Sequence, residues 1–231
     1  MNPILFRYGG FALHYSHVIF LAAFGLTYQL SQHRAKKLGI TTADWERALT
    51  YYVLGAVFGG RLGYVLSNLP LFLGRWREVL TLWHGAFTVW GAILGLWLAS
   101  LVLKKRGQAG GLDILAIVFP LFLGLAEWGR FTEGEGWGRM GQGILTWEYS
   151  GAARYPAWFF FSLWYLLTAL VLARHKARWA GEHFLIMVAS MALAALVLTP
   201  LSILPGAEAL MQYAWGILFL GVAAMMWVKH R

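Results

Sequence analysis

Long apolar windows separated by short basic segments dominate the chain. Five windows contain no Lys, Arg, Asp or Glu: 11–31, 83–103, 155–173, 183–204 and 209–228. A helix that crosses a hydrocarbon core of roughly 30 Å needs about 20 mostly apolar residues. Each of these windows therefore predicts a transmembrane helix.

Two further windows, 48–69 and 113–131, are equally long but contain charged residues. Arg61 lies in the first, and Glu127 and Arg130 lie in the second. Neither window shows the broad polar face of a helix that lies along the membrane surface. We therefore predict an all-α, polytopic membrane protein with seven transmembrane helices.

Basic segments predict the orientation of these helices. They follow the first, third, fifth and seventh predicted spans, as "QHRAKK", "KKR", "RHKAR" and "KHR". Because Lys and Arg concentrate in cytoplasmic loops, we expect the N-terminus outside and the C-terminus in the cytoplasm. The start, "MNPILFRYGG", lacks a signal-peptide cleavage pattern, so we expect the first span to remain in the protein.

Two stretches between the predicted spans are long enough to carry structure. Residues 70–82 mix aromatic, basic and apolar side chains, which predicts a segment along the outer interface. Residues 128–154 hold seven glycines and three glutamates. With no linker or low-complexity tract in the chain, we predict one transmembrane domain over residues 1–231, with 128–154 as an extracytoplasmic Gly-rich loop within it.

Composition and charge narrow the possible functions. Hydrophobic residues make up 59% of the chain and charged residues 13%, about half the charged fraction of a soluble domain. The net charge of +9 is explained by cytoplasmic loops beside anionic lipid, so no nucleic-acid partner is expected. Because the chain has no cysteine, a thiol in any reaction must belong to the substrate.

Glycines predict which helices pack together. Gly55, Gly59 and Gly63 repeat every four residues in the second span, and Gly91 and Gly95 do so in the third. Small residues let membrane helices approach closely. We therefore expect these two helices to touch.

Charged residues inside the predicted spans are candidate site residues. An arginine at the centre of a spanning helix costs about 2.5–3.5 kcal/mol on insertion scales, so such residues usually pair and mark a site. Glu127 and Arg130 are three residues apart and can pair on one helical face, whereas Arg61 can extend to the outer head groups. A guanidinium presents a planar fork of donors suited to phosphate oxygens, which indicates an anionic phospholipid as the partner.

Two carboxylates follow Arg130 in the Gly-rich stretch. Glu133 and Glu135 stand in "EGEGWGR", where the glycines let the backbone approach a ligand closely. A carboxylate at this place can act as a base or hold an arginine in position. The alternative is a solvated, ion-paired loop without a catalytic role.

Six segments in order resemble the landmarks of the prolipoprotein diacylglyceryl transferase family. They are "FALHYSHVIFLAAFG", "HRAKKLGI", "GGRLGYVL", "LWHGAFTVWGAILG", "GRFTEGEGWGR" and "ARYPAWFFF", and they cover about residues 3–165. The resemblance implies a bacterial inner-membrane enzyme with seven spans. It also implies transfer of a diacylglyceryl group from phosphatidylglycerol to the thiol of a lipobox cysteine in a preprotein, with release of glycerol phosphate.

The resemblance implies roles for particular residues. Arg61 and Arg130 match arginines near the lipid head group, Glu135 matches the acidic residue of a "GE" motif, and Tyr15 matches an aromatic position of the first span. The reaction needs cations around the phosphate and a group that takes the thiol proton. We therefore expect Glu135 and Arg130 to be catalytic and Arg61, Arg130 and Tyr15 to bind the lipid phosphate, with no metal and no cofactor.

Some positions depart from the family pattern. Trp90, in "VWGA", stands where the family typically has the histidine of "FHGG", and an indole N–H cannot accept a proton. The family's "GRIGNFINGE" is shortened to "GRFTEGE", and its "HPSQLYE" appears as "YPAWFFF". His84 and His17 are further candidates for the missing histidine, and a hydrogen-bonded structural role is the alternative for each.

Two functions therefore stay open. The first is a phospholipid-dependent transferase in which Glu135 handles the proton in place of the histidine. The second is a catalytically inactive relative that serves as a lipid-binding accessory subunit of a larger membrane complex. A channel or proton-coupled transporter has less support, because no polar track leads towards the cytoplasmic side.

Overall fold

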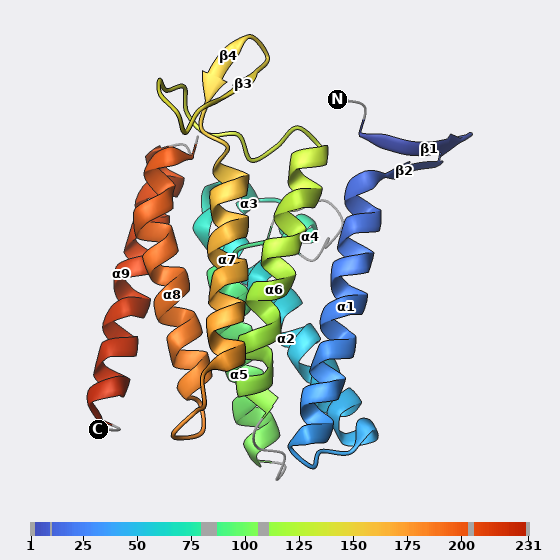
Figure 1. The fold of residues 1–231 in the computed structure, drawn as a ribbon, viewed down its shortest axis with the longest axis vertical. Coiled ribbons are helices and arrows are strands. Elements are labelled where there is room, and N and C mark those ends of the chain that lie inside the picture. The colour runs from blue at the N-terminus through green and yellow to red at the C-terminus, as the bar shows by residue number, and fades with distance from the viewer. Residues whose placement is uncertain (1–2, 10, 80–86, 106–110, 203–205, 230–231) are drawn as a thin grey trace. The chain divides into compact units, whose positions relative to one another are not determined.

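Long helices make up most of the computed structural model, which describes residues 3–9, 11–79, 87–105, 111–202 and 206–229 (Figure 1). Each predicted span overlaps one of these helices. They are α1 (Tyr15–Lys37), α2 (Thr42–Ser67), α5 (Val89–Lys105), α6 (Gly111–Thr132), α7 (Ala157–Arg174), α8 (Glu182–Leu198) and α9 (Gly206–Lys229). The short helices α3 (Leu69–Phe72) and α4 (Trp76–Val79) lie in the stretch predicted at 70–82, the rest of which falls outside the described residues.

Several helices have the length and composition of membrane spans. Within the described ranges, four are long and apolar enough to cross a bilayer: Thr42–Ser67, Gly111–Thr132, Ala157–Arg174 and Glu182–Leu201. Gln212–Val228 in α9 is apolar over a shorter stretch. The chain is therefore a multi-pass membrane protein, as the apolar windows predicted.

The chain divides into two compact units. Unit 1 comprises Met1–Ser31 and Leu115–Arg231, and unit 2 comprises Gln32–Ile114. The boundaries between the units fall within α1 and α6. The single domain expected over residues 1–231 stays a prediction.

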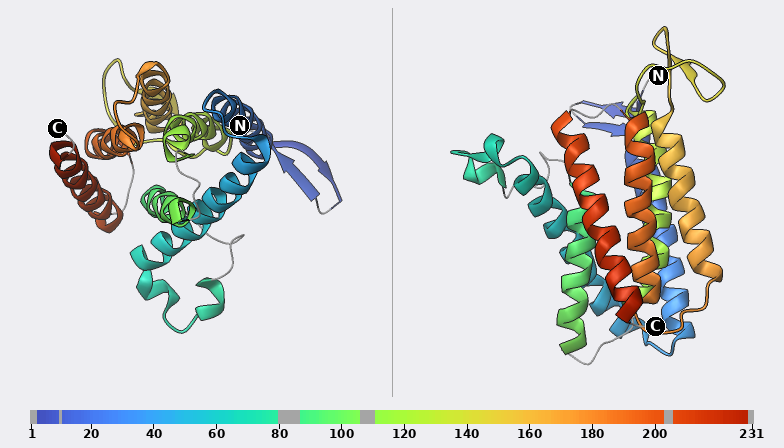
Figure 2. Two further views of the ribbon diagram at one scale, coloured as in Figure 1. Left: turned by 90° about the horizontal axis from the view of Figure 1, so that it is seen from below. Right: turned by 90° about the vertical axis from the view of Figure 1, so that its left-hand side faces the viewer.

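In unit 2, α2 and α5 lie side by side (Figure 2), and they pack through their glycines. A Cβ atom on Gly55 would collide with the carbonyl oxygen of Gly95, and one on Gly59 would collide with that of Gly91. The backbones of the two helices therefore approach as closely as small residues allow. The predicted contact between the second and third spans is confirmed.

In unit 1, the helices α1, α6, α7, α8 and α9 follow one another from right to left in Figure 1. Polar contacts join several neighbours. The Ser162 hydroxyl of α7 donates to the Gly124 carbonyl of α6 at 2.7 Å, and the Trp164 indole of α7 donates to the Ser190 hydroxyl of α8 at 3.0 Å. These bonds satisfy polar groups that a membrane interior would not solvate.

Two short hairpins correct the expectation of an all-α chain. Strands β1 (Ile4–Tyr8) and β2 (Phe11–His14) pair antiparallel, and so do β3 (Trp147–Tyr149) and β4 (Ala152–Arg154). Between β3 and β4, Ser150 and Gly151 both have positive φ angles, of 52° and 75°. A tight two-residue hairpin turn of type I′ requires this conformation, which a pattern of helical periodicity does not reveal.

The Gly-rich stretch also begins later than predicted. Helix α6 continues to Thr132, so residues 128–132 are helical and the loop starts at Glu133. The last turn is held by side chains: Arg130 pairs with Glu127 at 3.2 Å, and the Thr132 hydroxyl donates to the Gly129 carbonyl at 2.7 Å. An ion pair at this spacing adds a few tenths of a kcal/mol to a helix, on the order of 0.2–0.5.

Candidate functional site

Polar side chains gather in unit 1 at the end where α1 begins and α6 ends, at the top of Figure 1. Two segments supply them: the junction of β2 with α1, and the last turns of α6 with the residues that follow. The cluster consists of His14, Ser16, His17, Glu127, Arg130, Glu133 and Glu135.

Close packing of α1 against α6 brings the two segments together. A Cβ atom on Gly129 would lie 3.5 Å from the Cα of Ser16, so the first turn of α1 lies directly against the last turns of α6. One helical turn further in, the rings of Phe20 and Phe122 meet edge to face with centroids 5.4 Å apart. This contact places Ser16 within reach of the first residue after α6.

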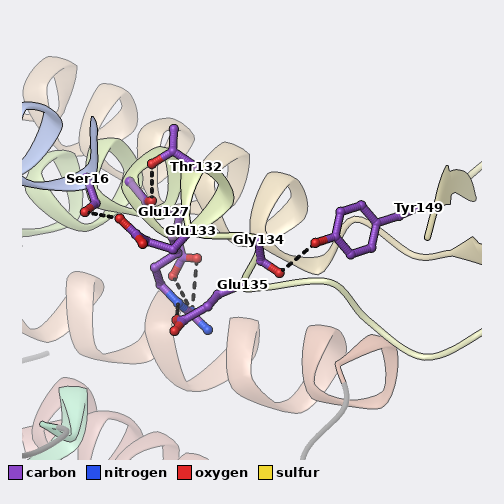
Figure 3. Close-up of polar contacts among 9 residues, drawn as sticks. Ser16, Glu127, Thr132, Glu133, Gly134, Glu135 and Tyr149 are labelled. Carbon is purple, nitrogen blue, oxygen red and sulfur yellow. Dashed lines mark hydrogen bonds and ion pairs between the residues drawn. The ribbon is translucent and has the colours of Figure 1, made fainter. Parts of the chain in front are cut away.

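Glu133 is the centre of a hydrogen-bond network. The Nδ1 atom of His14 lies 3.0 Å from both carboxylate oxygens of Glu133, and the Ser16 hydroxyl donates to Oε1 at 2.5 Å (Figure 3). The hydrogen bond from Ser16, followed by the bond and charge of His14, lowers the pKa of the Glu133 carboxyl below its ordinary value, although partial burial opposes this. Glu133 is therefore held as a carboxylate.

The network also assigns a tautomer to His14. An ionised carboxylate only accepts hydrogen bonds, so the proton of a neutral His14 must be on Nδ1 and the lone pair on Nε2. The neighbouring His17 ring has its centroid 5.3 Å away. Its Nδ1 accepts the backbone N–H of His14 at 3.3 Å, which is the hydrogen-bonded structural role that was the alternative for His17.

Arg130 forms the ion pair that the sequence predicted. Its Nη1 lies 3.3 and 3.2 Å from the two oxygens of Glu127, and its Nε lies 3.8 Å from Glu135 Oε2. The Arg130 side chain is 50% exposed and that of Glu127 only 13%. Among the described residues, no acceptor lies against Nη2 of Arg130, so this nitrogen can still bind a ligand.

Glu135 and Tyr15, both predicted site residues, lie at the surface. The Glu135 side chain is 66% exposed, and in Figure 3 it turns away from Ser16, whereas Glu133 points towards it. Tyr15 is the first residue of α1 and is 43% exposed. The catalytic role of Glu135 and the phosphate contact of Tyr15 stay predictions.

Two glycines of the loop pack against the protein itself. A Cβ atom on Gly136 would lie 2.7 Å from the Cβ of Trp158, and one on Gly138 would collide with the carbonyl oxygen of Leu201. Trp158 in turn stacks on Phe131 with centroids 4.4 Å apart. The absence of side chains at these two glycines therefore lets the loop pack closely on α7 and on the 3-10 helix Thr199–Leu201 that follows α8.

Arg61, in unit 2, is buried rather than extended to the head groups. It is 5% exposed, and it donates from Nε to the Val79 carbonyl at 3.2 Å and from Nη2 to the Glu78 carbonyl at 2.5 Å. Its Nη1 is buried and has no partner within the described ranges. The phosphate contact expected of Arg61 stays a prediction. In the structure, the Arg61 side chain holds α4 through these two hydrogen bonds.

Trp90 is 7% exposed near the start of α5. The indole therefore fills a packed position and offers no proton acceptor. His84 lies outside the described residues. The histidine–carboxylate pair that the structure does show, His14 with Glu133, joins residues 119 positions apart, and only the short spacing of His14, Ser16 and His17 hinted at it.

The fold and the cluster together define a helical, multi-pass membrane protein with a histidine, carboxylates and an arginine at one end of a helical unit. The profile of the prolipoprotein diacylglyceryl transferase family matches residues 3–201. The chain belongs to this family. The resemblance found in the sequence is confirmed.

Known relatives carry the name phosphatidylglycerol–prolipoprotein diacylglyceryl transferase. The protein of Bordetella avium (strain 197N) is 37% identical over 145 residues, which cover 60% of this chain and 55% of the relative. That of Thermotoga petrophila is 28% identical over 200 residues, which cover 79% of this chain and 67% of the relative. The chain thus spans little more than half the length of several relatives.

Proposed function

We propose that the protein transfers a diacylglyceryl group from phosphatidylglycerol to the cysteine thiol of a lipobox-containing preprotein. The observation that carries this proposal is the family match over residues 3–201. The names of the relatives from Bordetella and Thermotoga state the same lipid and the same acceptor. The absence of cysteine from the chain agrees with a thiol that comes from the substrate.

The proposal includes a topology and a location. The protein crosses the bacterial inner membrane seven times, with the N-terminus outside and the C-terminus in the cytoplasm. The long helices that overlap the seven predicted windows support the count, and the basic segments after alternate windows support the orientation. The cluster around Glu133 then faces the outer leaflet, where a secreted preprotein presents its cysteine.

Arg130 binds the phosphate of the lipid in this proposal. The substrate sulfur attacks a glycerol carbon, the carbon–oxygen bond to phosphate breaks, and glycerol phosphate leaves with the electron pair. Donors aimed at the leaving phosphate stabilise the charge that develops there. Glu127 fixes Nη1 of Arg130, and Nη2 remains for a phosphate oxygen.

Arg61 and Tyr15 are the other phosphate-binding residues of the proposal, and Glu135 is a catalytic residue. Their assignment comes from the family resemblance. The exposure of Tyr15 and Glu135 leaves both open to a head group. For Arg61, the buried Nη1 without a partner among the described residues is the donor that remains.

A second candidate is a catalytically inactive relative that binds lipid as an accessory subunit. The observation that favours it is Trp90, a buried indole where the family typically has a histidine. Replacement of a proton carrier by a bulky apolar ring is what a filled, unused pocket would show. An anionic phospholipid would then be a structural ligand rather than a substrate.

Restoration of growth distinguishes the two candidates. Cells depleted of their own transferase are supplied with this chain, and insertion of the protein is checked in isolated membranes. A transferase restores growth and lipid-modified preproteins. A chain that inserts normally but restores neither is an accessory protein, and a stoichiometric partner that copurifies would identify its complex.

A further inference from the structure

We propose that His14, held by Glu133, is the group that accepts the proton of the substrate thiol. This inference rests on the proposed transferase function and names a catalytic residue for it. The proposal is based on the hydrogen bonds and the exposure of His14.

One nitrogen of His14 is fixed and the other is available. Nδ1 faces both oxygens of Glu133 at 3.0 Å. Nε2, which then holds the lone pair, forms no hydrogen bond within the part of the chain that the structure describes. The His14 side chain is 30% exposed, so a substrate group can approach Nε2 from outside the protein.

The surroundings of His14 suit a ring that gains a positive charge. The Glu133 carboxylate faces the ring from the end of α6, and the Ser16 hydroxyl fixes that carboxylate from α1. Among the described residues, His17 in the first turn of α1 is the other titratable group whose ring contacts that of His14. Across the β1–β2 ladder, His14 is opposite the apolar Ile4. A base oriented by a third group in this way is the usual arrangement for activating a nucleophile.

The proton and electron balance is complete with groups of the protein and its two substrates. The thiol proton passes to Nε2 of His14, and the sulfur forms a bond to the glycerol carbon of the lipid. The bond between that carbon and the phosphate oxygen breaks, and its electron pair leaves with glycerol phosphate. The imidazolium of His14, stabilised by Glu133, then returns its proton to water.

Other acceptors in the cluster are less suited to the task. His17 already uses its Nδ1 lone pair for the backbone N–H of His14. Glu135 is ion-paired with Arg130 at 3.8 Å and would lose this ion pair if it took a proton. Its contribution to the proposed reaction is therefore to hold Arg130 in position. Glu133 is engaged by Ser16 and His14 and serves as a positioning residue.

The test uses purified full-length protein, vesicles of phosphatidylglycerol and a lipobox peptide with one cysteine. Mass spectrometry measures the diacylglyceryl peptide. We expect His14→Gln to lower kcat by roughly 100- to 10,000-fold, the range for loss of a general base, with little change in the KM for the peptide. His17→Gln, the matched histidine control in the first turn of α1, should lose far less.

The pH profile separates a base from a structural residue. A histidine base changes charge between about pH 5 and 8, so the wild-type rate should fall as the pH falls through this range. The residual rate of His14→Gln should lack that inflection. Glu133→Asp should keep the inflection of the pH profile. Glu133→Gln should reduce kcat and shift the pH of that inflection.

Each outcome decides a specific claim. Wild-type protein that forms no product overturns the proposed function and this inference with it. An active wild type with an equally active His14→Gln overturns this inference alone. If His14→Gln does not fold, the wild-type profile and Glu133→Gln decide, and a rate without inflection between about pH 5 and 8 overturns the role of His14.

Discussion

A single added methyl group at Gly95 should destabilise the packing of α2 against α5. In Gly95→Ala, the new Cβ would collide with the carbonyl oxygen of Gly55, lie 2.5 Å from its carbonyl carbon and lie 3.3 Å from the backbone nitrogen of Ala56. All three neighbours are backbone atoms of α2. Because they cannot rotate away as a side chain can, the two helices must separate.

The size of the effect follows from two opposing terms. Overpacking a tight contact costs typically about 1–3 kcal/mol, and contacts with backbone place this site in the upper part of that range. Alanine gains about 0.8–1.0 kcal/mol over glycine in helix propensity. We therefore expect a net loss of roughly 1–2 kcal/mol, or a melting temperature about 2–8 °C lower for a chain of this size.

Thermal unfolding of the purified protein in detergent measures this change through tryptophan fluorescence. Gly25→Ala in α1 is the matched control, since no described atom lies within 4 Å of a Cβ at that position. Only helix propensity should act there, so Gly25→Ala should melt at the wild-type temperature or above it. Equal shifts for the two variants would refute the glycine contact between α2 and α5.

Three further changes test the site. Arg130→Ala should reduce the amount of phosphatidylglycerol that the purified protein retains, as measured by lipid mass spectrometry. Arg47→Ala, which removes an exposed ion pair, should not. Equal retention in the two variants counts against a phosphate site at Arg130. The pKa of Glu133 is lowered on folding, so its stabilisation is present above the ordinary value of about 4.3 and is lost as the pH falls through the lowered value. The melting temperature of the wild type should therefore drop over that acidic range, and that of Glu133→Gln should drop less; parallel curves would contradict the network. Arg61→Met leaves the carbonyls of Glu78 and Val79 without their donor, so limited proteolysis should cut the segment of α3 and α4 faster. An unchanged rate would show that these bonds do not hold the segment.

Periodic and local features of the fold were predictable from the sequence. Apolar windows located the long helices because burial in lipid demands length and composition that few other segments share. Gly55 and Gly59 are four residues apart, and this spacing predicted the contact of α2 with α5. Two helix backbones that approach closely leave no room for side chains between them. The ion pair of Glu127 and Arg130 was also predictable, because it depends only on the spacing of two residues within one helix.

Features that depend on long-range contacts were not predictable. His14 and Glu133 are far apart in the sequence, and only the packing of Gly129 against Ser16 brings them together. The family resemblance directed attention to Trp90 and Glu135 instead. The β3–β4 hairpin was missed because its signal is a two-residue turn at Ser150 and Gly151, too short for a pattern that repeats along a helix.

The transfer reaction itself tests the proposed function most directly. Folded wild-type protein is incubated with phosphatidylglycerol vesicles and a lipobox peptide, and the peptide mass is followed over time. We predict that the peptide gains one diacylglyceryl group on its cysteine, and that neither a Cys-to-Ser peptide nor phosphatidylcholine vesicles give this product. Folded protein that leaves the peptide unmodified would contradict it.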